Sequence, residues 1–140
     1  MFRIHINASE PYDVVIENNS LSHISDYIRP LKEPCRVIIV SDDNVAPLYL
    51  KMVKANLTGA GYSVCEYVFP HGEDEKNATR LIDLVEYMAD QSLTRKDLLI
   101  ALGGGVVGDM AGFAAATYLR GIDYVQVPTS LLAAVDSSVG

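Results

Sequence analysis

The chain has 140 residues, 49% of them hydrophobic and 21% charged, and a formal net charge of −7. This length and composition are typical of one globular domain, and they exclude a disordered, collagen-like or disulfide-scaffold protein. The acidic balance argues against a nucleic-acid or anionic-membrane surface, because no broad basic patch would neutralise phosphates.

The sequence carries no recognisable targeting, membrane or metal-binding signal. Its longest uncharged run, Tyr124 to Val135, is too short to span a bilayer, and its first residues contain no apolar signal-peptide core. Cys35 and Cys65 fit no metal or redox spacing, and the three histidines form no ligand cluster. We therefore expect a cytoplasmic protein with two buried thiols and no metal site in this chain.

The first 30 residues predict a β-hairpin followed by a helix. Apolar residues alternate with polar ones from Phe2 to Ile6, which is the period of a half-buried strand, and a second apolar run covers Tyr12–Ile16. Ser20 is placed to cap a helix that stops before Pro30.

From residue 36 onward, predicted strands alternate with predicted helices. The strands are Arg36–Val40, Tyr62–Phe69, Leu98–Leu102 and Tyr124–Val127. The helices are Val45–Ala60, Lys76–Ala89, Val106–Leu119 and one that begins at Thr129. Two of the strands are continuous apolar runs, which indicates burial on both faces. The pattern predicts an α/β fold, with a Rossmann-like parallel sheet flanked by helices, in one domain over residues 1–140.

In such sheets ligands bind where the strands end, and the sharpest strand-end motif here is GGGVVGD, Gly103 to Asp109. Glycines let a diphosphate approach the backbone, and the amides at a helix N-terminus hold its charge. The alternative is a tight turn with close helix packing. The motif does not follow the first strand, and Asp123, the acid about twenty residues on, precedes a strand instead of ending one.

The other strand ends are ambiguous when taken alone. Glu73 could accept hydrogen bonds from a ribose and Lys76 could reach an anion, but acids also favour any helix N-terminus. Ser41–Asn44 could bind ribose hydroxyls or simply form a turn and a cap. Arg120 could clamp a phosphate, and Asp136 is costly on an apolar helix unless it faces a site; the alternatives are a surface arginine and a solvent-facing aspartate.

Taken together, these motifs resemble the 3-dehydroquinate synthases. The likeness rests on the run from Gly103 to Gly140, on GE-x-x-K at Gly72–Lys76 and on SDxNV at Ser41–Val45. A looser likeness extends to iron- or zinc-dependent alcohol and glycerol dehydrogenases, which share a GGG-x-x-x-D loop. The VPTSLLA-x-VDSS stretch favours the synthases.

The resemblance implies NAD- and metal-dependent cyclisation of 3-deoxy-arabino-heptulosonate 7-phosphate to 3-dehydroquinate with release of phosphate, the second step of the shikimate pathway. It implies that NAD oxidises a substrate hydroxyl and later returns the hydride, while zinc or cobalt polarises the reacting hydroxyls. The family's helical second domain, which holds the metal ligands, is absent from these 140 residues. We therefore expect the amino-terminal NAD-binding domain of a two-domain enzyme, inactive alone.

The resemblance also assigns residues by position. Asp136 resembles the carboxylate that holds a substrate hydroxyl, and Arg120 resembles the arginine that binds the substrate phosphate across a homodimer interface. The cofactor-binding positions are Asp42, Asn44, His71, Gly72, Glu73, Asp74, Glu75, Lys76, Gly104, Gly105, Val106, Val107, Gly108, Asp109, Thr129, Ser130 and Leu132.

Three alternatives remain open from the sequence: another sugar-phosphate cyclase, a polyol dehydrogenase of the same superfamily, or an NAD-binding module without chemistry of its own. Two stretches of small or apolar residues, Met110–Leu119 and Ser130–Gly140, predict self-association.

Overall fold

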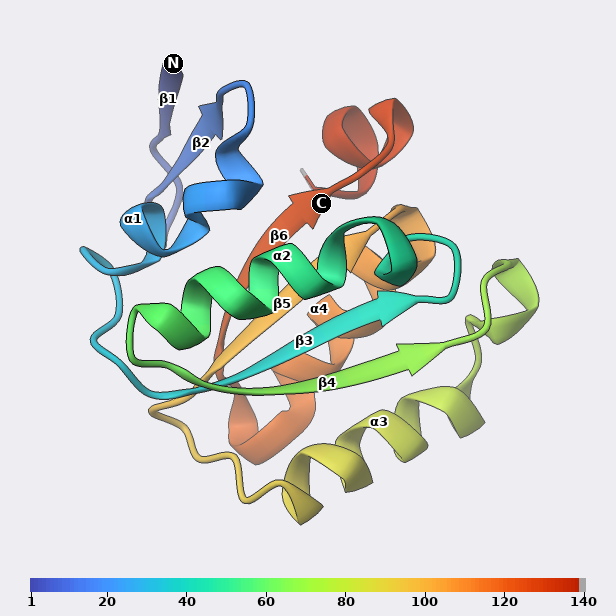
Figure 1. Ribbon diagram of the computed structural model, residues 1–140. Helices are drawn as coiled ribbons and strands as arrows, with labels where there is room; N and C mark the ends of the chain where they lie inside the picture. Colours follow the sequence, from blue (N-terminus) through green and yellow to red (C-terminus); the bar gives the residue numbers. More distant parts are fainter. Residues whose placement is uncertain (139–140) are drawn as a thin grey trace.

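The computed structural model describes residues 1–138. Four parallel strands form one sheet in the order β4–β3–β5–β6 (Figure 1). They are β3 (Arg36–Asp42), β4 (Ser63–Phe69), β5 (Leu98–Gly103) and β6 (Asp123–Pro128). The predicted α/β fold with a parallel sheet is confirmed.

Helices cover both faces of this sheet (Figure 1). Helices α1 (Ile24–Ile28) and α2 (Ala46–Gly59) pack on one face, and α3 (Ala78–Asp90) and α4 (Gly105–Thr117) pack on the other. Val37 and Ile39 of β3 face the first layer, whereas Ile38 and Val40 face the second. Strands β3 and β5 are therefore buried on both sides, as their apolar runs predict.

Local chemistry moves two helix boundaries from their predicted positions. Helix α3 begins at Ala78 instead of Lys76, because the Asn77 side chain caps it by accepting a hydrogen bond from the Arg80 amide. Helix α4 ends at Thr117 instead of Leu119, because Tyr118 is extended with ψ 123° and the next residues, Leu119 and Arg120, adopt left-handed φ values of 48° and 69°.

The amino-terminal hairpin pairs β1 (Phe2–Ile6) with β2 (Tyr12–Ile16) in antiparallel register. Phe2 lies opposite Ile16 and Ile4 opposite Val14, so one face of the hairpin is apolar. Phe2 is 74% exposed and Ile4 50% exposed. The hairpin is confirmed, but the prediction that its first strand is half-buried is wrong for this chain.

Both predicted terminal helices take a different form. A 3-10 turn, Ser20–His23, precedes α1, and its first flanking residue is Asn19 at φ 60°. No side chain caps that turn, so the capping role expected for Ser20 is wrong. After β6, the chain enters a helical segment whose Ala133–Ser137 part is π-helical. Val139 and Gly140, which belong to the predicted apolar surface, lie outside the described residues.

No helix within residues 1–138 combines the length and the apolar character needed to cross a membrane.

Candidate functional site: the crevice between β3 and β5

The strand order creates a crevice at the carboxyl ends of β3 and β5. From β3 the chain passes through α2 to β4 on one side, whereas from β5 it passes through α4 to β6 on the other side and the other face. Neighbouring strands whose connections diverge in this way mark the ligand-binding crevice of open α/β sheets.

Ser41 sits at the base of this crevice. The pairing of β3 with β5 stops at Val40 and Ala101, so the two strands separate beyond that point. The Ser41 hydroxyl, fully buried, donates to the Leu102 carbonyl at 2.8 Å. This hydroxyl satisfies a carbonyl that the separating ladder leaves behind. The sequence pattern predicts a polar turn at Ser41 and gives no sign of this role.

The three glycines that join β5 to α4, Gly103 to Gly105, serve different purposes. A Cβ on Gly103 would lie 2.6 Å from a Val107 methyl carbon, so glycine is required there for helix packing. A Cβ on Gly104 would meet nothing closer than the Ser130 Oγ at 3.9 Å, and one on Gly105 nothing closer than the Ser137 Oγ at 3.7 Å. Neither has a positive φ. The protein itself therefore leaves space for a side chain at both positions.

That space lies at the first turn of α4. The first hydrogen bond of this turn runs from the Gly108 amide to the Gly104 carbonyl, so the amides before Gly108 have no acceptor within the helix. No acidic side chain occupies this turn. The dipole of a 13-residue helix and free amides beside two uncrowded glycines fit a diphosphate.

The next residues of the motif, Val106 to Gly108, are poorly placed to contact a ligand through their side chains. Val107 is fully buried beneath Gly103 and Val106 is partly buried against the same core, so either could reach a ligand only through its backbone. Gly108 lies below the Gln126 Oε1 and the Ser137 Oγ, 3.4 Å and 3.6 Å from its would-be Cβ.

The loop after β4 brings Lys76 to this helix. Gly72 turns the chain at φ 114°, and the 3-10 turn Glu73–Glu75 follows it. The Lys76 Nζ then lies 2.5 Å from the Asp109 Oδ2 and 3.6 Å from the Glu73 Oε1. The hydrogen bond that Lys76 donates to the Asp109 carboxylate raises the pKa of Lys76, which keeps the ammonium charged.

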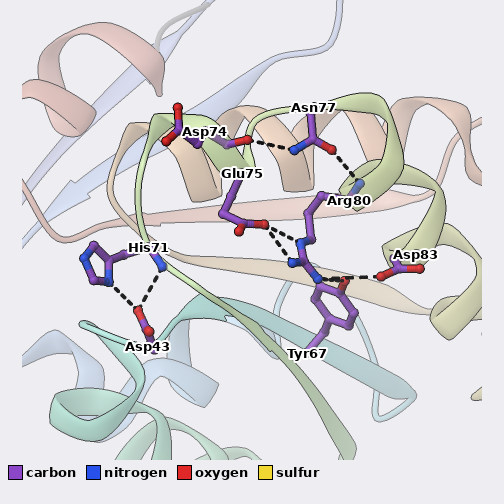
Figure 2. Close-up of polar contacts among 8 residues, drawn as sticks. All are labelled: Asp43, Tyr67, His71, Asp74, Glu75, Asn77, Arg80 and Asp83. Carbon is purple, nitrogen blue, oxygen red and sulfur yellow. Dashed lines mark hydrogen bonds and ion pairs between the residues drawn. The ribbon is translucent and has the colours of Figure 1, made fainter.

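Two further loop residues contact α3 or its capping residue (Figure 2). The Glu75 carboxylate contacts two guanidinium nitrogens of Arg80. The Asp74 carbonyl accepts a hydrogen bond from the Asn77 side chain at 2.7 Å. Both residues were predicted to bind cofactor. Glu75 has a structural partner in Arg80, and its contact with a cofactor stays a prediction.

The loop after β3 is tied to the same region. The Asp42 Oδ1 accepts hydrogen bonds from the Asn44 and Val45 amides, which form the turn weighed from the sequence, although no side chain caps α2. The Asp43 carboxylate binds both the backbone amide and the Nδ1 of His71, at 2.9 Å and 2.7 Å (Figure 2). The hydrogen bond from the His71 side chain lowers the pKa of Asp43. Asp43 was not singled out from the sequence, where it is one of two adjacent aspartates.

The end of β6 completes the rim of the crevice. The Thr129 amide donates to the Gly103 carbonyl at 2.9 Å, and the Ser130 Oγ accepts from the Ala133 amide at 3.2 Å. Leu132 is 70% exposed. Thr129 and Ser130 therefore lie beside the glycine loop, as the resemblance implies for cofactor-binding residues.

Arg120 and Asp136, the two predicted catalytic residues, lie at opposite ends of the sheet. Arg120 precedes the first residue of β6 and Asp136 follows its last, and six strand residues separate the two ends by roughly 20 Å. Within one chain they do not form a common site. Asp136 is exposed, so the expected cost of burying its carboxylate does not arise here, and the solvent-facing reading fits this chain.

Side chains that could hold a metal ion do not gather within residues 1–138 in groups of three or more. A metal therefore does not fit the described residues. Cys35 and Cys65 are free and only partly buried, so the prediction of two buried thiols is wrong. Their partial burial still raises the pKa of both thiols, so neither is an activated nucleophile.

Known proteins are similar to this chain in sequence and in fold. A family model described as 3-dehydroquinate synthase N-terminal matches residues 66–140. A 3-dehydroquinate synthase of Streptococcus pneumoniae is 50% identical over 130 residues, which are 93% of this chain and 37% of that protein. The chain therefore spans a little over a third of the length of this relative.

Two solved structures are also similar. A 2-deoxy-scyllo-inosose synthase complexed with carbaglucose-6-phosphate, NAD+ and Co2+ matches with a TM-score of 0.89 at 29% identity, over 99% of this chain and 38% of that one. A 2-epi-5-epi-valiolone synthase from Streptomyces hygroscopicus with NAD+ and Zn2+ bound matches with a TM-score of 0.80 at 29% identity, over 97% of this chain and 37% of that one. With the family model matching more than half of its residues, the chain belongs to the 3-dehydroquinate synthase family.

Proposed function

We propose that this chain is the NAD-binding part of a 3-dehydroquinate synthase. The observation that carries the proposal is the crevice at the ends of β3 and β5. Gly104 and Gly105 leave open space at the N-terminus of α4, and Lys76 reaches the same helix through Asp109. In this proposal the α4 amides hold the NAD diphosphate, and Lys76, Glu73, Thr129 and Ser130 contact the rest of the cofactor.

The bound NAD would supply a reversible hydride acceptor for a hydroxyl of the sugar-phosphate substrate. The chain's own residues would bind and orient the cofactor and shield it from water. The divalent metal, zinc or cobalt, would be held by residues other than those described here. We accordingly propose that the chain alone has no synthase activity and that the parent enzyme acts in the cytoplasm.

The separation of Arg120 from Asp136 supports a homodimer, in which Arg120 of one chain would reach the substrate held by another. In the adjacent helix α4, Phe113 is exposed and could contribute to a dimer interface. Ala115, in the same predicted self-association stretch, is fully buried in this chain's own core and does not belong to that interface. Sedimentation at concentrations up to about 100 μM would reveal even micromolar association. A strict monomer at that concentration would contradict the dimer.

A phosphate-release assay tests the activity part of the proposal. The chain is incubated with 3-deoxy-arabino-heptulosonate 7-phosphate, NAD and zinc, and no phosphate release above background is expected. Turnover of about 1 per second or more, an ordinary enzymatic rate, would show that the chain is sufficient by itself.

A second candidate is another sugar-phosphate cyclase, because both solved relatives bind NAD+ and a divalent metal at 29% identity. The 50% identity to a 3-dehydroquinate synthase favours the first candidate.

A further inference from the structure

Arg80 of α3 contacts the loop that carries Lys76 through Glu75 (Figure 2). The Arg80 Nε lies 2.7 Å from the Glu75 Oε2, and a second guanidinium nitrogen lies at the same distance from that oxygen. The two side chains are 25% and 24% exposed. Among the ion pairs of the described residues, no other pair shields both of its members so well, and shielding strengthens a charge-assisted hydrogen bond.

The guanidinium is itself fixed from two other sides (Figure 2). The Tyr67 hydroxyl on β4 lies 3.4 Å from one of its nitrogens, and the Asp83 carboxylate, one turn further along α3, lies 3.6 Å from the same nitrogen. Arg80 thus joins the loop, the edge strand and the helix. Its side chain has little freedom to follow the loop if the loop moves.

The backbone of Arg80 holds the loop a second time. Its amide donates to the Asn77 Oδ1 at 2.9 Å, and the Asn77 side-chain amide donates to the Asp74 carbonyl at 2.7 Å. The loop amides of Glu75 and Lys76 bond only to nearby carbonyls, those of Gly72 and Glu73. The side-chain anchor of the loop to α3 is therefore the contact between Glu75 and Arg80.

Adjacent residues of this loop face two different partners. Glu75 contacts Arg80 on α3, and Lys76 contacts Asp109 on α4. Fixing Glu75 therefore limits where the Lys76 backbone can lie. A loop ordered before the ligand arrives does not lose conformational entropy on binding, which raises affinity.

We propose that Arg80 is a positioning residue that acts through Glu75 to hold the Gly72–Lys76 loop in its cofactor-binding form. This inference rests on the proposed NAD site, but it assigns a role to a residue that touches no cofactor. Arg80 does not reach the crevice itself, since its side-chain contacts are Glu75, Tyr67 and Asp83.

The test compares Arg80→Met, which keeps much of the side chain's length but removes the charge, with Arg95→Met as control. Arg95 is exposed, and replacing it by methionine changes the net charge by the same amount. Hydrogen exchange of the Glu75, Lys76 and Asn77 amides and NAD affinity by calorimetry are measured for each variant. Arg80→Met should speed loop exchange and weaken NAD binding, each about tenfold, while β3 and β5 amides stay protected.

A charge exchange separates positioning from a general loss of stability. Arg80→Glu and Glu75→Arg should each loosen the loop, and the double variant should restore both slow loop exchange and NAD affinity in part. Arg95→Met should match the parent in both measurements. A double variant no better than the single ones would contradict a direct action of Arg80 through Glu75.

The two readouts also separate this inference from the NAD proposal. If Arg80→Met loosens the loop but the parent chain takes up no NAD, the anchoring role stands and the NAD assignment fails. If the parent binds NAD and Arg80→Met binds it equally well, the positioning role is wrong, whatever the exchange shows.

Discussion

The Lys76 Nζ lies 2.5 Å from the Asp109 Oδ2, and this ion pair joins the loop after β4 to the first two turns of α4. The two side chains are 40% and 38% exposed, so the pair contributes little to the stability of the fold. Its effect is positional: it brings a cation to the helix whose N-terminus carries Gly104 and Gly105. Substitutions at residues that serve this crevice should therefore act on binding, whereas those at residues that serve the fold should act on stability.

Replacing Lys76 should affect binding far more than folding. Lys76→Met removes the cation beside the crevice, and we expect NAD affinity to fall about tenfold with little change in melting temperature. Lys54→Met is the matched control, because Lys54 forms a similarly exposed ion pair with Glu66, with 2.9 Å between the Lys54 Nζ and the Glu66 Oε2. This pair lies away from the crevice. Equal losses of affinity in the two variants would remove Lys76 from the site.

The glycine loop predicts opposite outcomes at two positions. Gly105→Val fills the space next to the α4 amides and should abolish measurable NAD binding in a folded chain. Gly103→Ala places a Cβ 2.6 Å from Val107 and should lower the free energy of unfolding by about 1–3 kcal/mol. Calorimetric titration and urea unfolding of both variants make the comparison. A Gly105→Val chain that binds NAD like the parent would place the diphosphate elsewhere.

The base of the crevice depends on one buried hydroxyl. Ser41→Ala leaves the Leu102 carbonyl without its donor, so the free energy of unfolding should fall by about 1–3 kcal/mol. Ser63→Ala, at an exposed position on β4, is the control and should change it by less than about 0.5 kcal/mol. Indistinguishable urea midpoints for the two variants would show that the Ser41 bond is dispensable.

The contact between His71 and Asp43 predicts a dependence on pH. His71 lowers the pKa of Asp43 in the folded chain, so the stabilisation is present above about pH 4 and disappears as the pH falls through the lowered value. His71→Ala should therefore be less stable than the parent at about pH 6, and the difference should shrink toward about pH 3. In an Asp43→Asn background, His71→Ala should show no such trend. A difference that grows in acid would reverse the assigned sign.

The fold could be predicted from the sequence where one local pattern dominates. The continuous apolar runs of β3 and β5 and the 3.6-residue period of α3 each indicate their element without reference to the rest of the chain. The glycine motif indicates the site for the same reason, because a strand, three glycines and a helix are contiguous. Periodicity does not report the order of strands, so the crevice between β3 and β5 became visible only in the structure.

The remaining features depend on how loops fold. The His71 partner of Asp43 lies 28 residues further along the chain, and the Arg80 partner of Glu75 is fixed by how the loop joins α3. No spacing rule encodes either contact. Helix α4 ends at an extended Tyr118 and a left-handed Leu119 although leucine favours helices, so the backbone departs from the local propensity there. The exposed hairpin face likewise follows from the absence of a neighbouring element among the described residues, not from the β1 pattern.

Titration of the 140-residue chain with NAD by calorimetry examines the proposed cofactor site without depending on catalysis. We expect saturable binding of one NAD per chain, which is lost in Gly105→Val and retained in Lys54→Met. A folded parent chain that shows no saturable uptake of NAD at millimolar concentration would contradict the assignment of this crevice to the cofactor.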